Sequence, residues 1–278
     1  MNTRARTMPL QRSMTFGTCN ETMDALMWIA TRAARMKRDA AQRLTMRHDD
    51  TIVSETGNDE APAPLRRRKA HIRESNEAHL LACAEAVFAE RGFEGASTAM
   101  IAERAGLPKA NVHYYFPTKL ALYRRVLEDL FEDWHRAADT FECSDDPVDA
   151  IGGYVRAKME LSRRRPLGSK VWASEIIHGA EHMEDILTER VKPWLDTRVK
   201  VIDDWIARGL LAPVDARTLM YMIWATTQHY ADFDAQIRAL RGKRALTQKA
   251  FEATTEEVVQ LVIRACGAVS PGQAGGSR

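Results

Sequence analysis

The chain has 278 residues, 45% of them hydrophobic and 28% charged, which is enough for one large or two modest domains with a sizeable core. Its 40 Lys and Arg residues nearly balance 38 Asp and Glu residues, so the bulk charge indicates neither a general polyanion binder nor an acidic tail. The four cysteines form no C-x-x-C pair, which disfavours a disulfide-stapled or cysteine-ligated zinc fold and suits a reducing compartment.

The longest charge-free apolar stretch, Thr218 to Ala231, is shorter than the roughly 18 to 20 residues that cross a bilayer. The apolar run near the start is interrupted by Asp24 and is not followed by a small-residue cleavage site, which disfavours a signal peptide. We therefore expect a cytoplasmic protein with no membrane segment.

Residues 1–72 differ in composition from the rest of the chain. They are Arg-rich and poorly periodic, and we expect a largely disordered basic extension. Seven of the 12 methionines fall in the first 46 residues, so a misassigned start, with translation beginning at a methionine such as Met46, is one hypothesis, and intact mass tests it. A targeting peptide is the alternative.

Helical spacing of apolar residues begins after Ser75, which we expect to be an N-cap, and stops at Gly92. A second short helix is capped by Ser97 or Thr98 and ends at Gly106, which permits a tight bend. Pro108 is well placed as the first residue of a third helix. The pattern predicts a helix-turn-helix.

The remaining pattern is also helical. Thr118 caps a predicted helix over 119–141, and further helices are expected over 148–164, 169–177, 183–208, 215–240 and 246–266. No stretch has the two-residue alternation of a strand, and residues 267–278 have the composition of a flexible tail. We expect an all-α fold.

The stretch from Ser97 to Lys119, STAMIAERAGLPKANVHYYFPTK, resembles the DNA-binding signature of the TetR family of bacterial transcriptional regulators. The combination of I-A-x-x-A-G, an aromatic cluster and F-P-T-K carries the resemblance. It implies a helix-turn-helix domain over 73–120, followed by a helical ligand-binding and dimerisation domain over 121–266. It also implies a double-stranded DNA operator, a small-molecule effector and a homodimer as partners, with no enzymatic activity and no cofactor.

In such a domain, the third helix enters the major groove with its outward side chains against base edges and phosphates. Lys119 would hold a phosphate at the start of the fourth helix. The candidate DNA-binding residues are Thr98, Lys109, Asn111, His113, Tyr114 and Lys119. The basic run Arg66 to Lys69 has two open interpretations, a flexible arm that contacts phosphates or a solvated charge run.

Polar and aromatic residues interrupt the apolar segment 219–233. This segment, residues 154–162 and Trp134 together resemble the pyrimidine-utilisation (Rut-type) branch of the family. This resemblance implies uracil or thymine as the ligand. An indole stacks on a flat pyrimidine, and a Gln amide matches its C=O and N–H edge. The candidate ligand-binding residues are Trp224, Gln228, Trp134, Trp172 and Glu175, although buried aromatics are more often simple packing.

A homodimer would read a near-palindrome, and the last two helices are the expected interface. Related TetR regulators form a four-helix bundle there, and an apolar stripe in the last helix fits such a seam: Phe251, Val258, Val259, Leu261 and Val262.

An enzyme is the rival hypothesis, because His178-Gly-Ala-Glu181-His182 matches the inverted zincin pattern H-x-x-E-H of a zinc-dependent hydrolase. Gly179 and the absence of an identifiable third ligand argue against it. A regulator of this family with an unrelated ligand is the other alternative.

Overall fold

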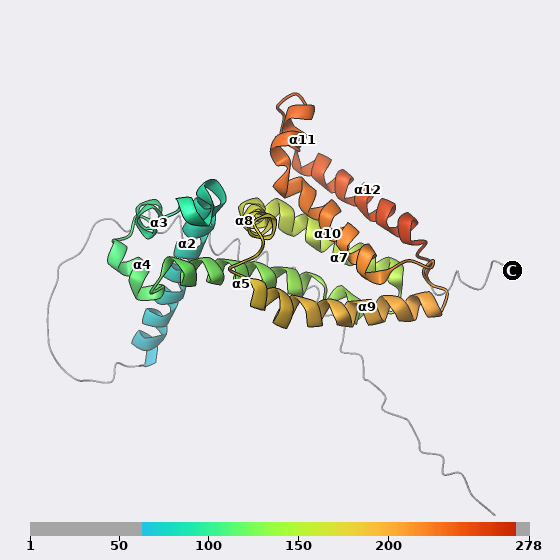
Figure 1. Ribbon diagram of the computed structural model, residues 1–278, viewed down its shortest axis with the longest axis horizontal. Helices are drawn as coiled ribbons and strands as arrows, with labels where there is room; N and C mark the ends of the chain where they lie inside the picture. The colour runs from blue at the N-terminus through green and yellow to red at the C-terminus, as the bar shows by residue number, and fades with distance from the viewer. Residues whose placement is uncertain (1–62, 271–278) are drawn as a thin grey trace, which may run out of the picture.

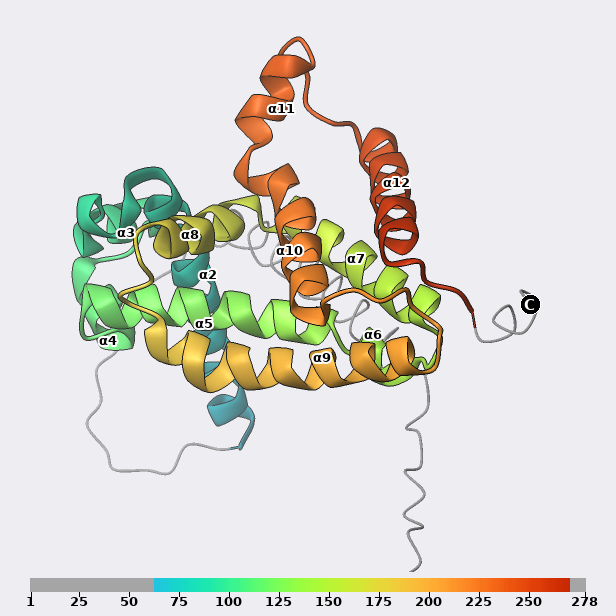
Figure 2. The ribbon, with the colours of Figure 1, turned by 45° about the vertical axis from the view of Figure 1, so that its right-hand side comes forward.

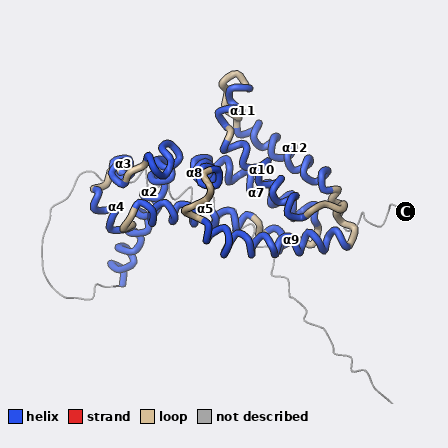
Figure 3. The backbone as a smooth tube through the Cα atoms, in the orientation of Figure 1, coloured by secondary structure: helices blue, strands red, loops and turns tan. Residues whose placement is uncertain are grey.

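The computed structural model describes residues 63–270, with side chains from residue 71 onward; the expectations for 1–62 and 271–278 lie outside the described residues. Within that part of the chain every regular element is helical and no strand occurs (Figures 1 and 3). The all-α prediction is confirmed. None of the described helices is long and apolar enough to span a membrane.

We call the first three helices the head: α2 (Ala63–Gly95), α3 (Thr98–Ala105) and α4 (Lys109–Tyr115). The remaining helices form the body. They are α5 (Lys119–Ala137), α6 (Thr140–Cys143), α7 (Pro147–Arg164), α8 (Pro166–Ile177), a π-helix (Ile186–Val191), α9 (Lys192–Ala207), α10 (Ala216–Asp232), α11 (Asp234–Leu240) and α12 (Gln248–Cys266). The head lies at one end of the body, and α11 projects between α10 and α12 (Figures 1 and 2).

The turns of the head follow local sequence signals. The Ser97 side chain accepts a hydrogen bond from the backbone N–H of Met100, and the Thr118 side chain caps α5 in the same way through Ala121. Gly106 has φ 64°, a left-handed conformation that lets α3 end and α4 begin within a few residues. These caps confirm the predicted helix-turn-helix.

Several predicted boundaries are wrong. Helix α2 begins at Ala63, so Ser75 lies inside the helix and does not cap it, and residues 63–72, which we expected to belong to a disordered extension, are helical. No Gly or Pro interrupts the chain between Pro64 and Gly92, so nothing local stops the helix earlier. The predicted helix over 215–240 is divided at Phe233, and 183–208 begins with the π-helix.

The molecule has two hydrophobic cores. The boundary between them does not coincide with the boundary between the head and the body. The head core extends from α2, α3 and α4 into α5 and α8; its buried members include Leu80, Phe88, Ile101, Val112, Leu127, Val171, Trp172 and Met183. The body core lies between α6, α7, α9, α10 and α12, and includes Phe141, Tyr154, Trp194, Trp205, Met220, Ile223 and Val259. Helix α8 therefore packs as part of the head's interior.

An ion cluster fastens the start of α8 to the head. The Arg165 guanidinium donates to Glu85 of α2 at 2.6 Å and to Asp129 of α5 at 3.1 Å, and it also pairs with Asp133. We call this group the junction cluster. Because its carboxylates come from α2 and α5, Arg165 ties three helices at one point.

Gly168 lies beside the junction cluster and admits no side chain. A Cβ added there would lie 2.4 Å from Leu130 Cδ2 and 3.0 Å from Glu85 Oε1. We expect Gly168→Ala to lower the free energy of unfolding by about 1–3 kcal/mol through overpacking. Urea denaturation followed by circular dichroism measures it. Gly95→Ala is the matched control, since its Cβ would have only an ordinary contact at 3.5 Å; equal losses in both variants would contradict the prediction.

The predicted dimer seam on α12 is wrong for four of its five residues. Phe251, Val258, Val259 and Val262 are buried inside the subunit, because α12 turns this face toward α7 and the body core. Leu261 differs, with 57% of its surface exposed. A second subunit would meet the opposite face of α12.

Candidate DNA-binding and ligand-binding sites

The candidate DNA-binding surface is the outer face of α4. Val112 is fully buried in the head core, and Phe116 closes the helix from its other end, so the orientation of α4 is fixed. The opposite face is in solvent: Lys109, Asn111, His113 and Tyr114 are all exposed, Tyr114 to 70%. The structure thus presents four of the six predicted DNA contacts together on one short, rigid helix.

The other two predicted contacts lie at helix starts. Thr98 is the first residue of α3 and is half-buried. The Lys119 ammonium donates to the Phe93 carbonyl at 2.8 Å and lies 4.2 Å from the centroid of the Phe93 ring. Its first partner is therefore inside the head, where it joins the start of α5 to the end of α2.

Helix α2 runs past α4 and adds positive charge next to it. The Arg73 guanidinium lies 5.8 Å from the centroid of the Tyr114 ring, so this part of α2 borders the outer face of α4. The basic run 66–69 lies two turns or less before Arg73 in the same helix. Positive charge from α2 therefore lies beside the candidate DNA-binding surface of α4.

In the body, two predicted ligand residues meet. Trp134 of α5 and Trp172 of α8 lie edge to face with ring centroids 4.7 Å apart. The amino group of Lys158, on α7, lies 4.1 Å from the centroid of the Trp134 ring, and only 2% of this lysine is exposed. Burial lowers the pKa of Lys158 to about 7, and the Asp232 carboxylate opposes the shift only in part.

Asp232 lies at the end of α10 and is linked to α8. One of its oxygens accepts a hydrogen bond from the Ser169 hydroxyl at 2.6 Å. Burial raises the pKa of Asp232, while the Ser169 hydrogen bond and the Lys158 charge act in the opposite direction. Within the described residues, no carboxylate lies inside the 4.0 Å ion-pairing distance of the Lys158 amino group. The two groups therefore interact electrostatically without forming an ion pair.

Trp224 and Gln228 are arranged differently from each other. The Trp224 indole donates to the Tyr154 hydroxyl at 2.8 Å and stacks near Trp194, with ring centroids 6.0 Å apart. One face and the N–H of Trp224 are therefore occupied by protein. Gln228 is half-buried one turn later, and its amide has no hydrogen-bond partner among the described residues. It shares a helical stripe with Trp224 and Asp232, at steps of four.

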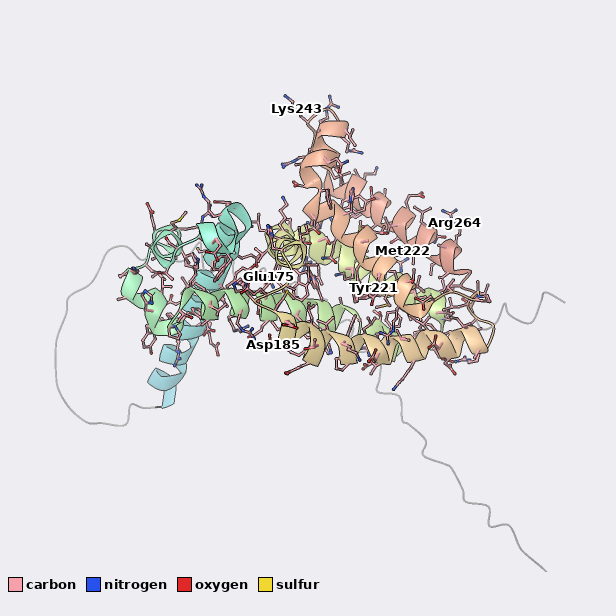
Figure 4. The ribbon with its side chains drawn as sticks, in the orientation of Figure 1. Glu175, Asp185, Tyr221, Met222, Lys243 and Arg264 are labelled. Atoms are coloured by element: carbon pink, nitrogen blue, oxygen red, sulfur yellow. The ribbon has the colours of Figure 1, made fainter. Side chains whose placement is uncertain are left out.

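Glu175 is not available to a ligand. Its carboxylate is 5% exposed and accepts hydrogen bonds from the Tyr123 hydroxyl at 2.9 Å and the His182 backbone N–H at 2.8 Å. The His182 ring in turn packs against Phe93 of the head. Glu175 belongs to the contact between α8 and the head (Figure 4), and we remove it from the ligand site.

The inverted zincin pattern is not on a helix. Gly179 and Ala180 have positive φ angles, 100° and 60°, so the chain turns between the two histidines. His178 lies 2.7 Å from the Ser174 carbonyl, whereas His182 contacts Glu175. Within the described residues, no group of three metal-ligating side chains is close enough to hold an ion. The two histidines of the pattern are therefore held by different partners on either side of the turn.

Sequence reasoning missed Lys158, Ser169 and Asp232. A signal for Lys158 was present, because it falls on the same helical stripe as Ile151, Tyr154 and Val155, which are buried. A lysine on the apolar face of a helix requires an explanation. Asp232 lies eight residues after Trp224, so the stripe from Trp224 through Gln228 reaches it.

Comparisons with known proteins agree with this arrangement. The profile of the family described as "Bacterial regulatory proteins, tetR family" matches residues 80–126, and that described as "YcdC-like protein, C-terminal region" matches residues 127–269. The chain is 39% identical over 184 residues to the HTH-type transcriptional regulator RutR of Escherichia coli strain K12, covering 66% of this chain and 87% of RutR.

Solved structures share the fold. The transcriptional regulator SCO4942 from Streptomyces coelicolor aligns with a TM-score of 0.55 at 22% identity, over 69% of this chain and 98% of that one. The ketosteroid transcriptional regulator KstR2 of Mycobacterium tuberculosis aligns with a TM-score of 0.53 at 20% identity, over 68% and 94% of the two chains.

Proposed function

The chain belongs to the TetR family of bacterial transcriptional regulators, and we propose that it binds a palindromic DNA operator as a homodimer and releases it when uracil or thymine binds. In this role it represses genes of pyrimidine utilisation from the cytoplasm. The observation that carries the DNA-binding part is the outer face of α4, where Lys109, Asn111, His113 and Tyr114 are exposed on a helix locked by Val112.

Each exposed group suits a defined DNA contact. Asn111 can pair with an adenine edge, and Lys109 with guanine or a phosphate. His113 and Tyr114 suit phosphates. So do Thr98 and the ammonium N–H groups of Lys119 that do not bind the Phe93 carbonyl. Two heads read two half-sites when they are about 34–36 Å apart, or a multiple of that distance. The exposed apolar side chains Tyr221 of α10 (Figure 4) and Leu261 of α12 support a subunit interface formed by these two helices.

The ligand part of the proposal rests on two kinds of side chain: aromatic rings that can stack on a flat ligand, and a polar group that can hydrogen-bond to its edge. Trp134 and Trp172 suit a flat ring, and Gln228 has an unpaired amide that matches a C=O and N–H edge. The resemblance to the pyrimidine-utilisation branch supports the choice of uracil or thymine. Trp224, with its N–H bound to Tyr154, contributes as a wall of the site.

Release follows from linkage. A ligand that binds better when the heads are wrongly spaced weakens operator binding by the same factor, and a typical coupling of about 1–3 kcal/mol changes operator affinity about 5- to 150-fold. Footprinting on the DNA upstream of the gene, with and without each base, tests the proposal. If neither base changes the affinity of the folded protein for its operator, the ligand assignment fails.

Asn111 gives a direct test of base reading. We expect Asn111→Ala to weaken operator binding by about 1–3 kcal/mol and to relax sequence preference at one position of each half-site. Gel-shift titration on a set of operators with single substitutions measures both effects. Asp203→Ala, at an exposed position of α9, is the control that leaves affinity unchanged. A uniform loss across all operators would assign Asn111 to a phosphate in place of a base.

A further inference from the structure

We propose that Lys158 and Asp232 together recognise a ring lactam, that is, a C=O beside an N–H within a planar heterocycle, so that the effector bridges a buried lysine and a half-buried aspartate. This inference rests on the proposed function, because it treats the protein as a ligand-responsive regulator. It assigns the recognition of the ligand's polar edge to two residues that the sequence patterns did not single out.

The amino group of Lys158 is buried without a polar partner among the described residues. It is 2% exposed, and the face of Trp134, 4.1 Å away, is its neighbour on one side. Within the described residues it makes no hydrogen bond and no ion pair. A lysine buried without a partner opposes folding. A ligand that carries a hydrogen-bond acceptor would give the Lys158 amino group the partner that it lacks.

Lys158 lies between two hydrogen bonds that join α7 to α10. One turn before it, Tyr154 receives the hydrogen bond from Trp224; one turn after it, the Ser162 hydroxyl donates to the Thr227 carbonyl at 2.9 Å. Helices α7 and α10 are thus joined on both sides of Lys158. Its amino group is held at this level of the body, where it interacts electrostatically with Asp232 at the end of α10.

The Asp232 carboxylate has only one of its two oxygens hydrogen-bonded. Ser169 occupies one carboxylate oxygen at 2.6 Å, and the other oxygen has no hydrogen-bond donor among the described residues. Lys158 and Asp232 interact electrostatically but are too far apart for an ion pair. A group that carries an acceptor next to a donor fits between them, with its C=O toward Lys158 and its N–H toward Asp232.

These charges select among ligand classes. A carboxylate would satisfy Lys158 but would be repelled by Asp232, and an amine would satisfy Asp232 but be repelled by Lys158. A neutral ring lactam satisfies both groups, while an indole of the Trp134–Trp172 pair contacts one of its faces. Gln228 can then read a second C=O or N–H, which a pyrimidinedione has and a simple lactam lacks.

The test compares variants and probes by calorimetric titration. We expect Lys158→Met and Asp232→Asn each to weaken binding of uracil about 10- to 150-fold, the range for losing a hydrogen bond to a charged group. The Lys200→Met control, at an exposed site on α9, should bind like the wild type. 1,3-Dimethyluracil, which has no N–H, and benzoate, which has no donor, should fail to bind the wild type.

A second readout separates recognition from structure. Without ligand, Lys158→Met should melt at the same temperature as the wild type or higher, because the variant removes an unpaired buried amine and keeps the apolar stem against Trp134. A lower melting temperature together with retained uracil binding would overturn the inference. Uracil binding of wild-type strength in both variants would overturn it as well, while leaving the proposed function intact.

The assignment of uracil or thymine as the ligand can be wrong while the lactam inference holds. If the wild type binds neither uracil nor thymine but binds 2-pyridone in a manner that depends on Lys158 and Asp232, the lactam inference holds and the pyrimidine assignment is wrong. If the wild type binds none of these three probes, the lactam inference is wrong, and operator binding through α4 still stands as a separate result.

Discussion

Replacing Arg165 by methionine is expected to lower the free energy of unfolding by about 3–5 kcal/mol, the range for removing one partner from a buried ion pair. Arg165 joins Glu85, Asp129 and Asp133, and its loss leaves these carboxylates close together with less positive charge among them. Methionine keeps most of the side-chain volume, so the effect is electrostatic. Urea denaturation monitored by tryptophan fluorescence measures it.

The control for this experiment is Arg208→Met, since Arg208 pairs with Asp145 and Asp204 at the surface, where ion pairs contribute little to stability. Adding Glu85→Gln to Arg165→Met should recover part of the loss, because it removes one of the uncompensated charges. If the double variant is less stable than Arg165→Met alone, the junction cluster is held by packing and not by charge.

Replacing Trp205 by alanine is expected to cost about 3–5 kcal/mol, because it empties a large volume in the body core. Trp205 is 1% exposed, and its ring lies 5.7 Å from that of Phe141 in a stacked arrangement. Calorimetry gives the change in stability. Ile177→Ala is the control at an exposed position, with no loss expected.

The shape of the calorimetric transition adds information about the two cores. Trp205 belongs to the body core, whereas α5 and α8 pack into the head core. If the two cores unfold as one unit, Trp205→Ala shifts a single transition to lower temperature. A transition that splits into two, with only the lower one shifted, would show that the cores are separately stable. A loss below about 1 kcal/mol would contradict close packing at Trp205.

Much of the head could be predicted from sequence because its boundaries are decided by neighbouring residues. Ser97 and Thr118 cap the helices that follow them, and Gly106 takes the left-handed conformation that the bend needs. These are local effects of backbone and side-chain chemistry. The start of α2 was missed for the same reason: Ser75 can cap a helix, but nothing near it prevents the helix from starting earlier.

Long-range packing was harder to predict. The stripe around Val259 was assigned to a subunit seam, but an apolar stripe only predicts burial and does not say against what; here α7 covers it. Glu175 was assigned to the ligand, but it accepts hydrogen bonds from Tyr123 and His182. Tyr123 is on another helix, α5, and His182 lies beyond the turn that follows α8. Lys158 was passed over because a lysine in a helix is usually solvated.

The shared membership of α8 has a practical consequence for redesign of the protein as a biosensor. Trp172 contacts Trp134, another candidate ligand-binding residue, and it is also a buried member of the head core. A mutation at Trp172 that accommodates a different inducer would also alter the packing of α8 against α2 and α5 in the head core, so under the proposed function inducer preference and basal promoter leakage would change together. Libraries that vary Gln228 and the other walls on α10 avoid this linkage and allow the inducer to be changed on its own.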